Sequence, residues 1–119
     1  MSREIVVERR GSVYLVRFED GSKAYLAIRE DPERGVMELV ETYTPPQHRG
    51  KGVAKALVKK AVEDAKKKGL KIVPICSYSV YYFIKHPEER EILADEFRRL
   101  GDEGLRNYFK ERLAAEKGH

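Results

Sequence analysis

The first half of the chain shows short apolar runs separated by turn residues, a pattern typical of an antiparallel sheet. Asp20-Gly21 is a hairpin signal, and residues 31–35 form a second polar loop. Pro45 and Pro46 end the last run, because proline cannot donate a hydrogen bond to a strand ladder. The runs that we interpret as strands of one antiparallel meander are residues 4–8, 13–18, 24–29 and 36–44.

The apolar spacing then changes, and residues 53–68 have the period of an amphipathic helix that ends at Gly69. The apolar run at residues 70–76 predicts a buried strand, parallel to the strand at 36–44 through a right-handed crossover. Three further helices are predicted at residues 78–85, 88–100 and 103–116, and Gly101 and Gly104 mark the break between the last two. The predicted fold class is therefore α/β with a mixed sheet and a C-terminal helical extension.

The composition fits one globular domain. The 119 residues are 41% hydrophobic and 37% charged, with a formal net charge of +4. Lys, Glu and Arg abound while Gln and Asn occur once each, a balance reported for proteins from hot habitats. The positive charge is compatible with an anionic ligand.

The number and spacing of cysteine and histidine residues indicate the redox compartment of the protein and whether it has a metal site. The single cysteine, Cys76, excludes a disulfide within the chain and favours a reducing compartment. Residues 1–10 lack the apolar segment of a leader, and no run approaches the length of a membrane span, so we expect a cytoplasmic protein. His48, His86 and His119 are scattered relative to Cys76, and we expect no metal site.

The segment between the strand at 36–44 and the helix at 53–68 carries the strongest chemical signal. It reads Thr44-Pro45-Pro46-Gln47-His48-Arg49-Gly50-Lys51-Gly52, a basic, glycine-rich turn. Free backbone N–H groups at a helix N-terminus favour an anion, and Arg49 and Lys51 add positive charge. Thr44, the turn and Cys76 fall at the carboxyl edge of the parallel strands, where such units bind ligands. We expect a phosphorylated ligand there.

The turn is neither a Walker loop nor a Rossmann fingerprint, since neither GxxxxGK[ST] nor GxGxxG occurs. Gln47-x-x-Gly50-x-Gly52 instead resembles the Q/R-x-x-G-x-G/A motif of the GCN5-related N-acetyltransferases. Residues 16–88 also resemble the small, single-domain YjdJ-type branch of that superfamily. Further matching pieces are Arg17-Phe18 with Asp20-Gly21, Thr42 with Pro45, the run from Gly69 to Tyr78, Tyr82, and His86-Pro87-Glu88.

This resemblance implies that residues 1–88 bind acetyl-coenzyme A, with its pyrophosphate on the backbone amides of the turn. The residues that we assign to the coenzyme are Thr44, Gln47, His48, Arg49, Gly50, Lys51, Gly52, Val53 and Ala54. Members usually carry an acidic residue and a valine where this chain has Tyr43 and Thr44, so no role of that acid transfers. The resemblance is silent on residues 89–119, whose apolar stripe we expect to pack on the same domain or to form a homodimer.

Acetyl transfer to an amine needs a polarised thioester, a deprotonated amine and a stabilised leaving thiolate. Cys76 is the sharpest side-chain candidate, either as an acetyl-accepting thiolate or as a thiol that lines the pocket. A tyrosine of this region often protonates the thiolate in the wider superfamily, which makes Tyr81 and Tyr82 candidates. At most one faces the thiol, because they point about 100° apart, and aromatic packing is the alternative for both. Glu38 and Glu41 are candidate bases on opposite strand faces.

The expected function is transfer of an acetyl group from acetyl-coenzyme A to a primary amine, either of a protein (a lysine or an N-terminus) or of a small molecule. A coenzyme-A-binding module with little catalysis, acting through a protein partner, is the first alternative. A basic nucleic-acid-binding domain is the second, suggested by the lysines of residues 55–71. Glu63 and Asp64 interrupt those lysines, and no aromatic residues interleave with them.

Overall fold

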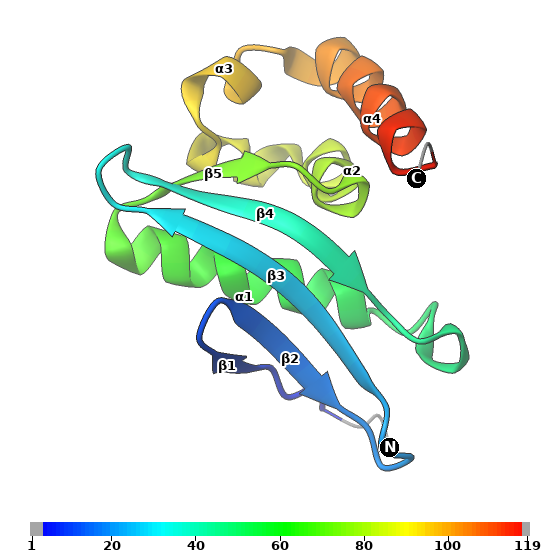
Figure 1. The fold of residues 1–119 in the computed structure, drawn as a ribbon. Coiled ribbons are helices and arrows are strands. Elements are labelled where there is room, and N and C mark those ends of the chain that lie inside the picture. Colours follow the sequence, from blue (N-terminus) through cyan, green and yellow to red (C-terminus); the bar gives the residue numbers. More distant parts are fainter. Residues whose placement is uncertain (1–3, 118–119) are drawn as a thin grey trace.

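The structure is a computed structural model that describes residues 4–117 and is built around a mixed five-stranded sheet (Figure 1). The strands are β1 (Glu8–Arg10), β2 (Val13–Arg17), β3 (Lys23–Asp31), β4 (Val36–Tyr43) and β5 (Lys71–Pro74). They lie in the order β1-β2-β3-β4-β5, with β1 to β4 antiparallel and β4 parallel to β5. The predicted α/β class, the meander and the parallel strand pair are confirmed.

The helical elements follow the meander along the chain, and α1 packs on one face of the sheet. They are η1 (Pro46–His48), α1 (Val53–Lys68), α2 (Ser77–Lys85), η2 (Pro87–Ile92), α3 (Asp95–Arg98) and α4 (Gly101–Lys117). Helix α1 has the predicted bounds, and Gly69 ends it with a φ of 70° while Leu70 N–H donates to Ala65 O at 2.9 Å. No helix within the described residues is long and apolar enough to cross a bilayer.

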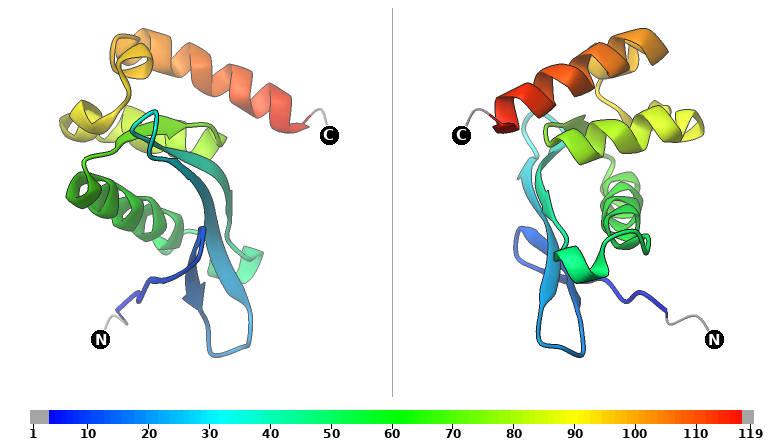
Figure 2. Two further views of the ribbon diagram at one scale, coloured as in Figure 1. Left: turned by 60° about the vertical axis from the view of Figure 1, so that its left-hand side comes forward. Right: turned by 90° about the vertical axis from the view of Figure 1, so that its right-hand side faces the viewer.

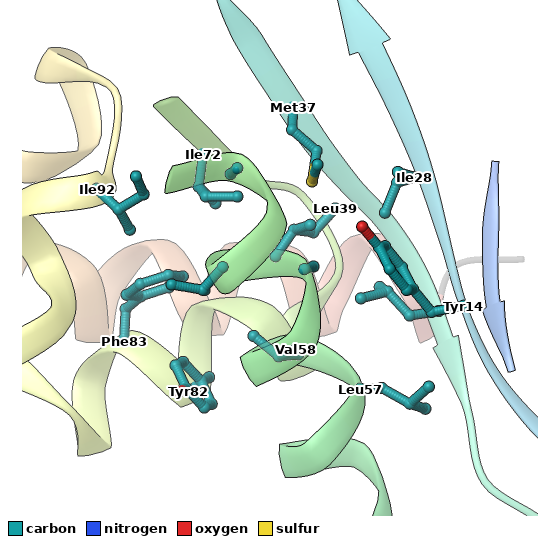
Figure 3. Packing of buried hydrophobic residues seen from close by; sticks show 14 of the residues in the cluster. Tyr14, Ile28, Met37, Leu39, Leu57, Val58, Ile72, Tyr82, Phe83 and Ile92 are labelled. Carbon is teal, nitrogen blue, oxygen red and sulfur yellow. The ribbon is translucent and has the colours of Figure 1, made fainter. Parts of the chain in front are cut away.

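The main core lies between one face of the sheet and α1 (Figures 2 and 3). Leu57 and Val58 of α1 meet Tyr14, Leu26 and Leu39 of the sheet, and all five are fully buried. The Tyr14 hydroxyl donates to Asp64 at 2.8 Å, so the one polar atom of that ring is satisfied. This packing fixes the start of α1 relative to the end of β4.

The first strand differs from the prediction. Residues 4–7 form no strand, and β1 is at Glu8–Arg10, where it pairs with β2. Gly11 has a φ of 59°, which lets the chain reverse between Arg10 and Val13. Glu8 forms an ion pair with Arg17 of β2. The weak apolar alternation therefore predicts the first strand at the wrong residues. Backbone pairing with β2 and the ion pair between Glu8 and Arg17 define its position at the sheet edge.

The predicted helix at residues 88–100 is wrong, because two of its residues pair with the free edge of β5. Leu93 forms a parallel bridge with Ile72, and Ala94 N–H donates to Ile72 O at 2.9 Å. The segment is thereby split into η2, an extended pair and α3. An open strand edge offers unpaired backbone groups, so its pairing outweighs the local helical pattern.

Helix α4 begins at Gly101, earlier than predicted, and includes Gly104. A Cβ atom at Gly104 would lie 2.8 Å from Leu100 Cβ, so only glycine fits this close approach. Leu105 packs against Val80 and Ile84 of α2, and Figure 2 shows α4 lying across α2. The C-terminal helix thus rests mainly on α2.

Candidate functional site

The parallel strands separate at the carboxyl edge of the sheet. Their register runs from Val36 opposite Lys71 to Leu39 opposite Pro74 and then stops. Ile75 N–H and Cys76 N–H both donate to Leu39 O at 3.0 Å, and the chain then turns into α2. β4 runs on to Tyr43 with no partner in β5 among the described residues. The two strands therefore leave a split between them.

A bulge in β4 lies at the mouth of this split. Ala27 of β3 faces Glu41 and Ile28 faces Leu39, so Val40 is an extra residue on β4. A bulge bends its strand and increases the local twist. The bend therefore lies directly after Leu39, the last residue of β4 that pairs with β5.

The turn that follows β4 presents free backbone amides. Gly50 and Gly52 have φ values of 78° and 81°, and Gly52 is the N-cap of α1. Within the described part of the chain, no hydrogen-bond partner exists for the N–H groups of residues 50–55. Such a row of amides at a helix N-terminus binds anions, and the helix dipole adds to the attraction.

A hollow of about 220 Å³ connects this turn to α2. It is lined by Thr44, His48, Arg49, Gly50, Gly52, Val53, Ala54, Lys55 and Tyr78. A larger hollow of about 770 Å³ lies beside it, and the two share His48 and Val53. Lys51 and Phe18 line the larger one. An elongated ligand that occupied both hollows would cross the turn.

The polar side chains of the turn bind the protein itself. His48 Nε2 lies 2.9 Å from Asp20 Oδ2, and the His48 ring stacks on Phe18 with centroids 3.6 Å apart. Gln47 Nε2 also donates to Asp20, at 3.3 Å. Arg49 Nε donates to Thr44 O at 2.9 Å. These contacts of Gln47, His48 and Arg49 hold the turn in shape and leave its backbone amides and the Lys51 side chain as the groups available to a ligand.

Asp20 anchors the turn to the hairpin between β2 and β3. Its carboxylate accepts hydrogen bonds from Ser22 Oγ at 2.6 Å and from Ser22 N–H at 2.9 Å. Together with the contacts from Gln47 and His48, these bonds hold the pKa of Asp20 well below its usual range. Asp20 therefore stays ionised, and the anchor persists, across the physiological pH range.

Cys76 lies at the base of the split, as the N-cap of α2. Its side chain is 5% exposed, and the Thr42 hydroxyl donates to its sulfur at 3.9 Å. Burial is the main cause that raises the pKa of the Cys76 thiol, although hydrogen bonds from Ser79 and Thr42 act in the opposite direction. The sulfur therefore carries its proton near neutral pH, and it faces the end of β4.

The structure places Tyr81 and Tyr82 away from the small hollow. Tyr82 is 1% exposed, belongs to the main core and donates a hydrogen bond to Glu89 (Figure 3). Tyr81 is 39% exposed, with its ring centroid 5.9 Å from that of Phe109. Neither tyrosine lines the hollow beside the turn.

Tyr78 is the tyrosine that lines the small hollow. It is half-buried in the first turn of α2, and burial raises its pKa, with smaller effects from Tyr81 and Cys76. The sequence feature that could have identified Tyr78 is its position two residues after Cys76, in the first turn of the helix that follows the split.

The two candidate bases, Glu38 and Glu41, are engaged elsewhere. Glu38 forms ion pairs with Arg29 and Arg34 on the sheet surface. Glu41 accepts a hydrogen bond from Tyr25 at 2.6 Å. Glu41 lies opposite Ala27, whereas Thr42 next to it lies opposite the buried Leu26, so Glu41 and Thr42 point to different faces.

Among residues 4–117, no three His, Cys, Asp or Glu side chains come together where they could hold a metal ion. His48 and His86 are within this part of the chain, and His119 lies outside the described residues. His86 Nδ1 lies 2.8 Å from Tyr82 O, and its ring stacks on that of Tyr82. Its contacts are thus with the end of α2.

Comparisons with known proteins agree with this geometry. A family model described as GCN5-related N-acetyl-transferase matches residues 13–92, from β2 to the end of η2. Among solved structures, the chain is similar to a GCN5-like candidate N-acetyltransferase from Staphylococcus aureus that was determined by NMR. That match has a TM-score of 0.61 and 20% identity, and it covers 76% of this chain and 88% of the other. The fold is therefore shared, and the family match over two thirds of the sequence shows that the chain belongs to the GCN5-related N-acetyltransferases.

Proposed function

We propose that the protein binds acetyl-coenzyme A and transfers the acetyl group to a primary amine. The observation that carries this proposal is the split between β4 and β5, flanked by the free amides of residues 50–55. The split offers a narrow path for the acyl arm, and the amides offer a site for the pyrophosphate. Membership in the family supports the same reaction class.

The two hollows suggest how the coenzyme lies. We place the pyrophosphate on the amides of residues 50–55, the acyl arm along Thr44 and Tyr78 toward Cys76, and the nucleotide in the larger hollow beside Lys51. Because His48 and Val53 line both hollows, one extended molecule can fill them while it crosses the turn. The Lys51 ammonium would then face a phosphate.

In the proposed reaction the amine nitrogen attacks the thioester carbonyl, the carbon–sulfur bond breaks, and the coenzyme leaves as a thiolate. Backbone N–H groups of β4 beyond Leu39 have no β5 partner among the described residues, so they are available to polarise the carbonyl. Tyr78 supplies the proton that the thiolate takes up. The attacking amine loses its proton to solvent.

Cys76 in this account contacts the thioester and does not carry the acetyl group. A covalent relay requires a thiolate, and burial keeps the Cys76 pKa above its ordinary value. The chain therefore favours direct attack by the amine.

Calorimetry with acetyl-coenzyme A, followed by thiol release with a panel of amines, tests the proposal. We expect binding at micromolar concentration and thiol release that depends on an amine. Binding without release would instead identify a coenzyme-A-binding module. The absence of binding at micromolar concentration would contradict both functions. The cytoplasmic location stays a prediction.

A matched variant tests the role of Cys76. Cys76→Ala is expected to bind acetyl-coenzyme A as the wild type does and to transfer more slowly, because the sulfur no longer packs against the thioester. An acetylated cysteine, detected by mass spectrometry after mixing without amine, would contradict direct attack. Full activity of the variant would remove Cys76 from the mechanism.

A further inference from the structure

Three side chains of α4 contact the backbone on both sides of Cys76, at residues 74, 75 and 77. The Tyr108 hydroxyl donates to Pro74 O at 2.8 Å, and Arg112 Nε donates to Ile75 O at 2.6 Å. The Glu116 carboxylate accepts from Ser77 N–H at 2.7 Å and from Ser77 Oγ at 2.6 Å. Residues 108, 112 and 116 are four apart, so they lie along one edge of the helix. Figure 1 shows α4 running beside α2, past the end of β5.

These contacts satisfy backbone groups at the end of β5 and at the start of α2. β5 and its register with β4 end at Pro74, and the carbonyls of Pro74 and Ile75 accept hydrogen bonds from α4. The Ser77 N–H is the first amide of α2 and has no acceptor inside that helix. Helix α4 supplies a donor for each carbonyl and an acceptor for the amide. Residues 74–77 are therefore fixed from the side opposite to β4.

We propose that Tyr108, Arg112 and Glu116 are positioning residues that hold the segment 74–77, and with it Cys76, at the base of the split. The catalytic consequence of this position rests on the proposed function. The three residues lie beyond residue 92, where the family match ends, so the match does not predict their contacts with residues 74–77.

The charge of Glu116 adds an electrostatic effect to the mechanical one. Its negative charge acts on the Cys76 thiol and contributes to the raised pKa, after the larger effect of burial. Residue 116 thus helps to keep the thiol neutral while it fixes the start of α2. Plain apolar packing is the competing role for α4, since Leu105, Tyr108 and Phe109 already pack on α2.

The alkylation rate of Cys76 by iodoacetamide separates these roles, because the chain contains one cysteine. Arg112→Ala is expected to raise the rate about tenfold, since loss of one charge-assisted hydrogen bond makes local opening easier by about that factor. Glu116→Ala should also raise it, by release of Ser77 and removal of the nearby charge. Arg112→Lys keeps a charged donor, and we expect a rate near that of the wild type. Glu116→Gln keeps the acceptor for Ser77 but loses the charge, so its rate should lie between those of the wild type and Glu116→Ala.

Arg106→Ala is the matched control, because Arg106 is an exposed residue of the same helix that contacts Asp102 and not residues 74–77. Its alkylation rate should equal that of the wild type. Equal rates in Arg112→Ala, Glu116→Ala and Arg106→Ala would overturn the proposal. If Arg112→Ala does not fold, Glu116→Ala decides alone, since Glu116 is exposed near the end of α4.

Calorimetry measures the acetyl-coenzyme A affinity of the same variants, and this measurement tests the proposed function separately from the positioning role. We expect the acetyl-coenzyme A affinity to stay within about twofold of the wild type, while transfer falls with KM for the coenzyme unchanged. Failure of the wild type to bind acetyl-coenzyme A would overturn the proposed function. Faster alkylation of the variants would still support the positioning role.

Discussion

Gly50 and Gly52 have the positive φ values that the turn requires, and neither has a side chain that would cover its backbone. Their φ values of 78° and 81° lie in the left-handed region, which strains residues that carry a Cβ atom. A Cβ atom at either position would meet no other atom within 4 Å, so the space above the backbone is open to a ligand. This part of the site was predictable from sequence, because glycine at fixed spacing reports the backbone conformation directly.

Gly52→Ala should lower both stability and coenzyme affinity. A left-handed alanine costs about 1–2 kcal/mol of folding free energy, and the methyl group crowds the face on which the pyrophosphate lies. Gly35→Ala is the control, because Gly35 has a φ of 69°, open space around it and a place in the loop before β4. Urea denaturation should show a similar loss for both variants, and calorimetry should show weaker binding for Gly52→Ala alone. Equal affinity of the two variants would argue against the amide site.

Tyr78 was harder to assign, because α2 carries three tyrosines within one and a half turns. Tyr82 follows Tyr78 by four residues and lies on the same face, about 6 Å further along the axis, where its hydroxyl binds Glu89. Helical periodicity cannot distinguish these neighbours. Only the position of the turn relative to α2, a tertiary feature, selects Tyr78.

Tyr78→Phe should lower turnover by about a hundredfold and leave KM for the coenzyme nearly unchanged, because the ring remains and the proton donor is lost. Burial disfavours the phenolate and raises the pKa of Tyr78, so the donating form persists at every pH below that value. The wild-type rate should therefore rise with deprotonation of the amine up to at least about pH 10. Tyr81→Phe, at an exposed position, should behave as the wild type. A falling limb near neutral pH would exclude Tyr78 as the donor.

At the scale of elements, the sequence predicts what local signals determine and fails where distant segments pair. Helix α1 has the predicted bounds because its apolar period and Gly69 agree. The 88–100 segment has a helical period too, yet Leu93 and Ala94 pair with β5. The extra residue Val40 in β4 leaves no trace in the apolar pattern, so residue periodicity alone does not predict the split.

Leu93→Ala tests the correction to the 88–100 segment. Leu93 is 0% exposed and belongs to the main core, so its truncation should lower the free energy of unfolding by about 2–5 kcal/mol. Glu91→Ala, at an exposed position two residues earlier, should stay within about 0.5 kcal/mol of the wild type. Urea denaturation of both variants measures the difference. Equal stability would contradict the buried, extended conformation at Leu93.

At the scale of the whole molecule, the two sides of the site come from different parts of the chain. Residues 13–92 match the family and contain the turn, the split and Cys76. Helix α4 lies beyond that match and contacts the backbone on both sides of Cys76. The site is thus formed by the matched region, and its segment 74–77 is contacted by a helix outside the match.

The proposed function places the pyrophosphate of acetyl-coenzyme A on the amides of residues 50–55. Nitrogen–proton NMR spectra of the 13.8 kDa protein, recorded during titration with acetyl-coenzyme A and with S-acetylpantetheine, test it most directly. We predict that acetyl-coenzyme A shifts the amide signals of residues 50–55, whereas the analogue, which has no pyrophosphate, leaves those signals unchanged. Unchanged turn amides at saturating acetyl-coenzyme A, or equal shifts with both ligands, would contradict the account.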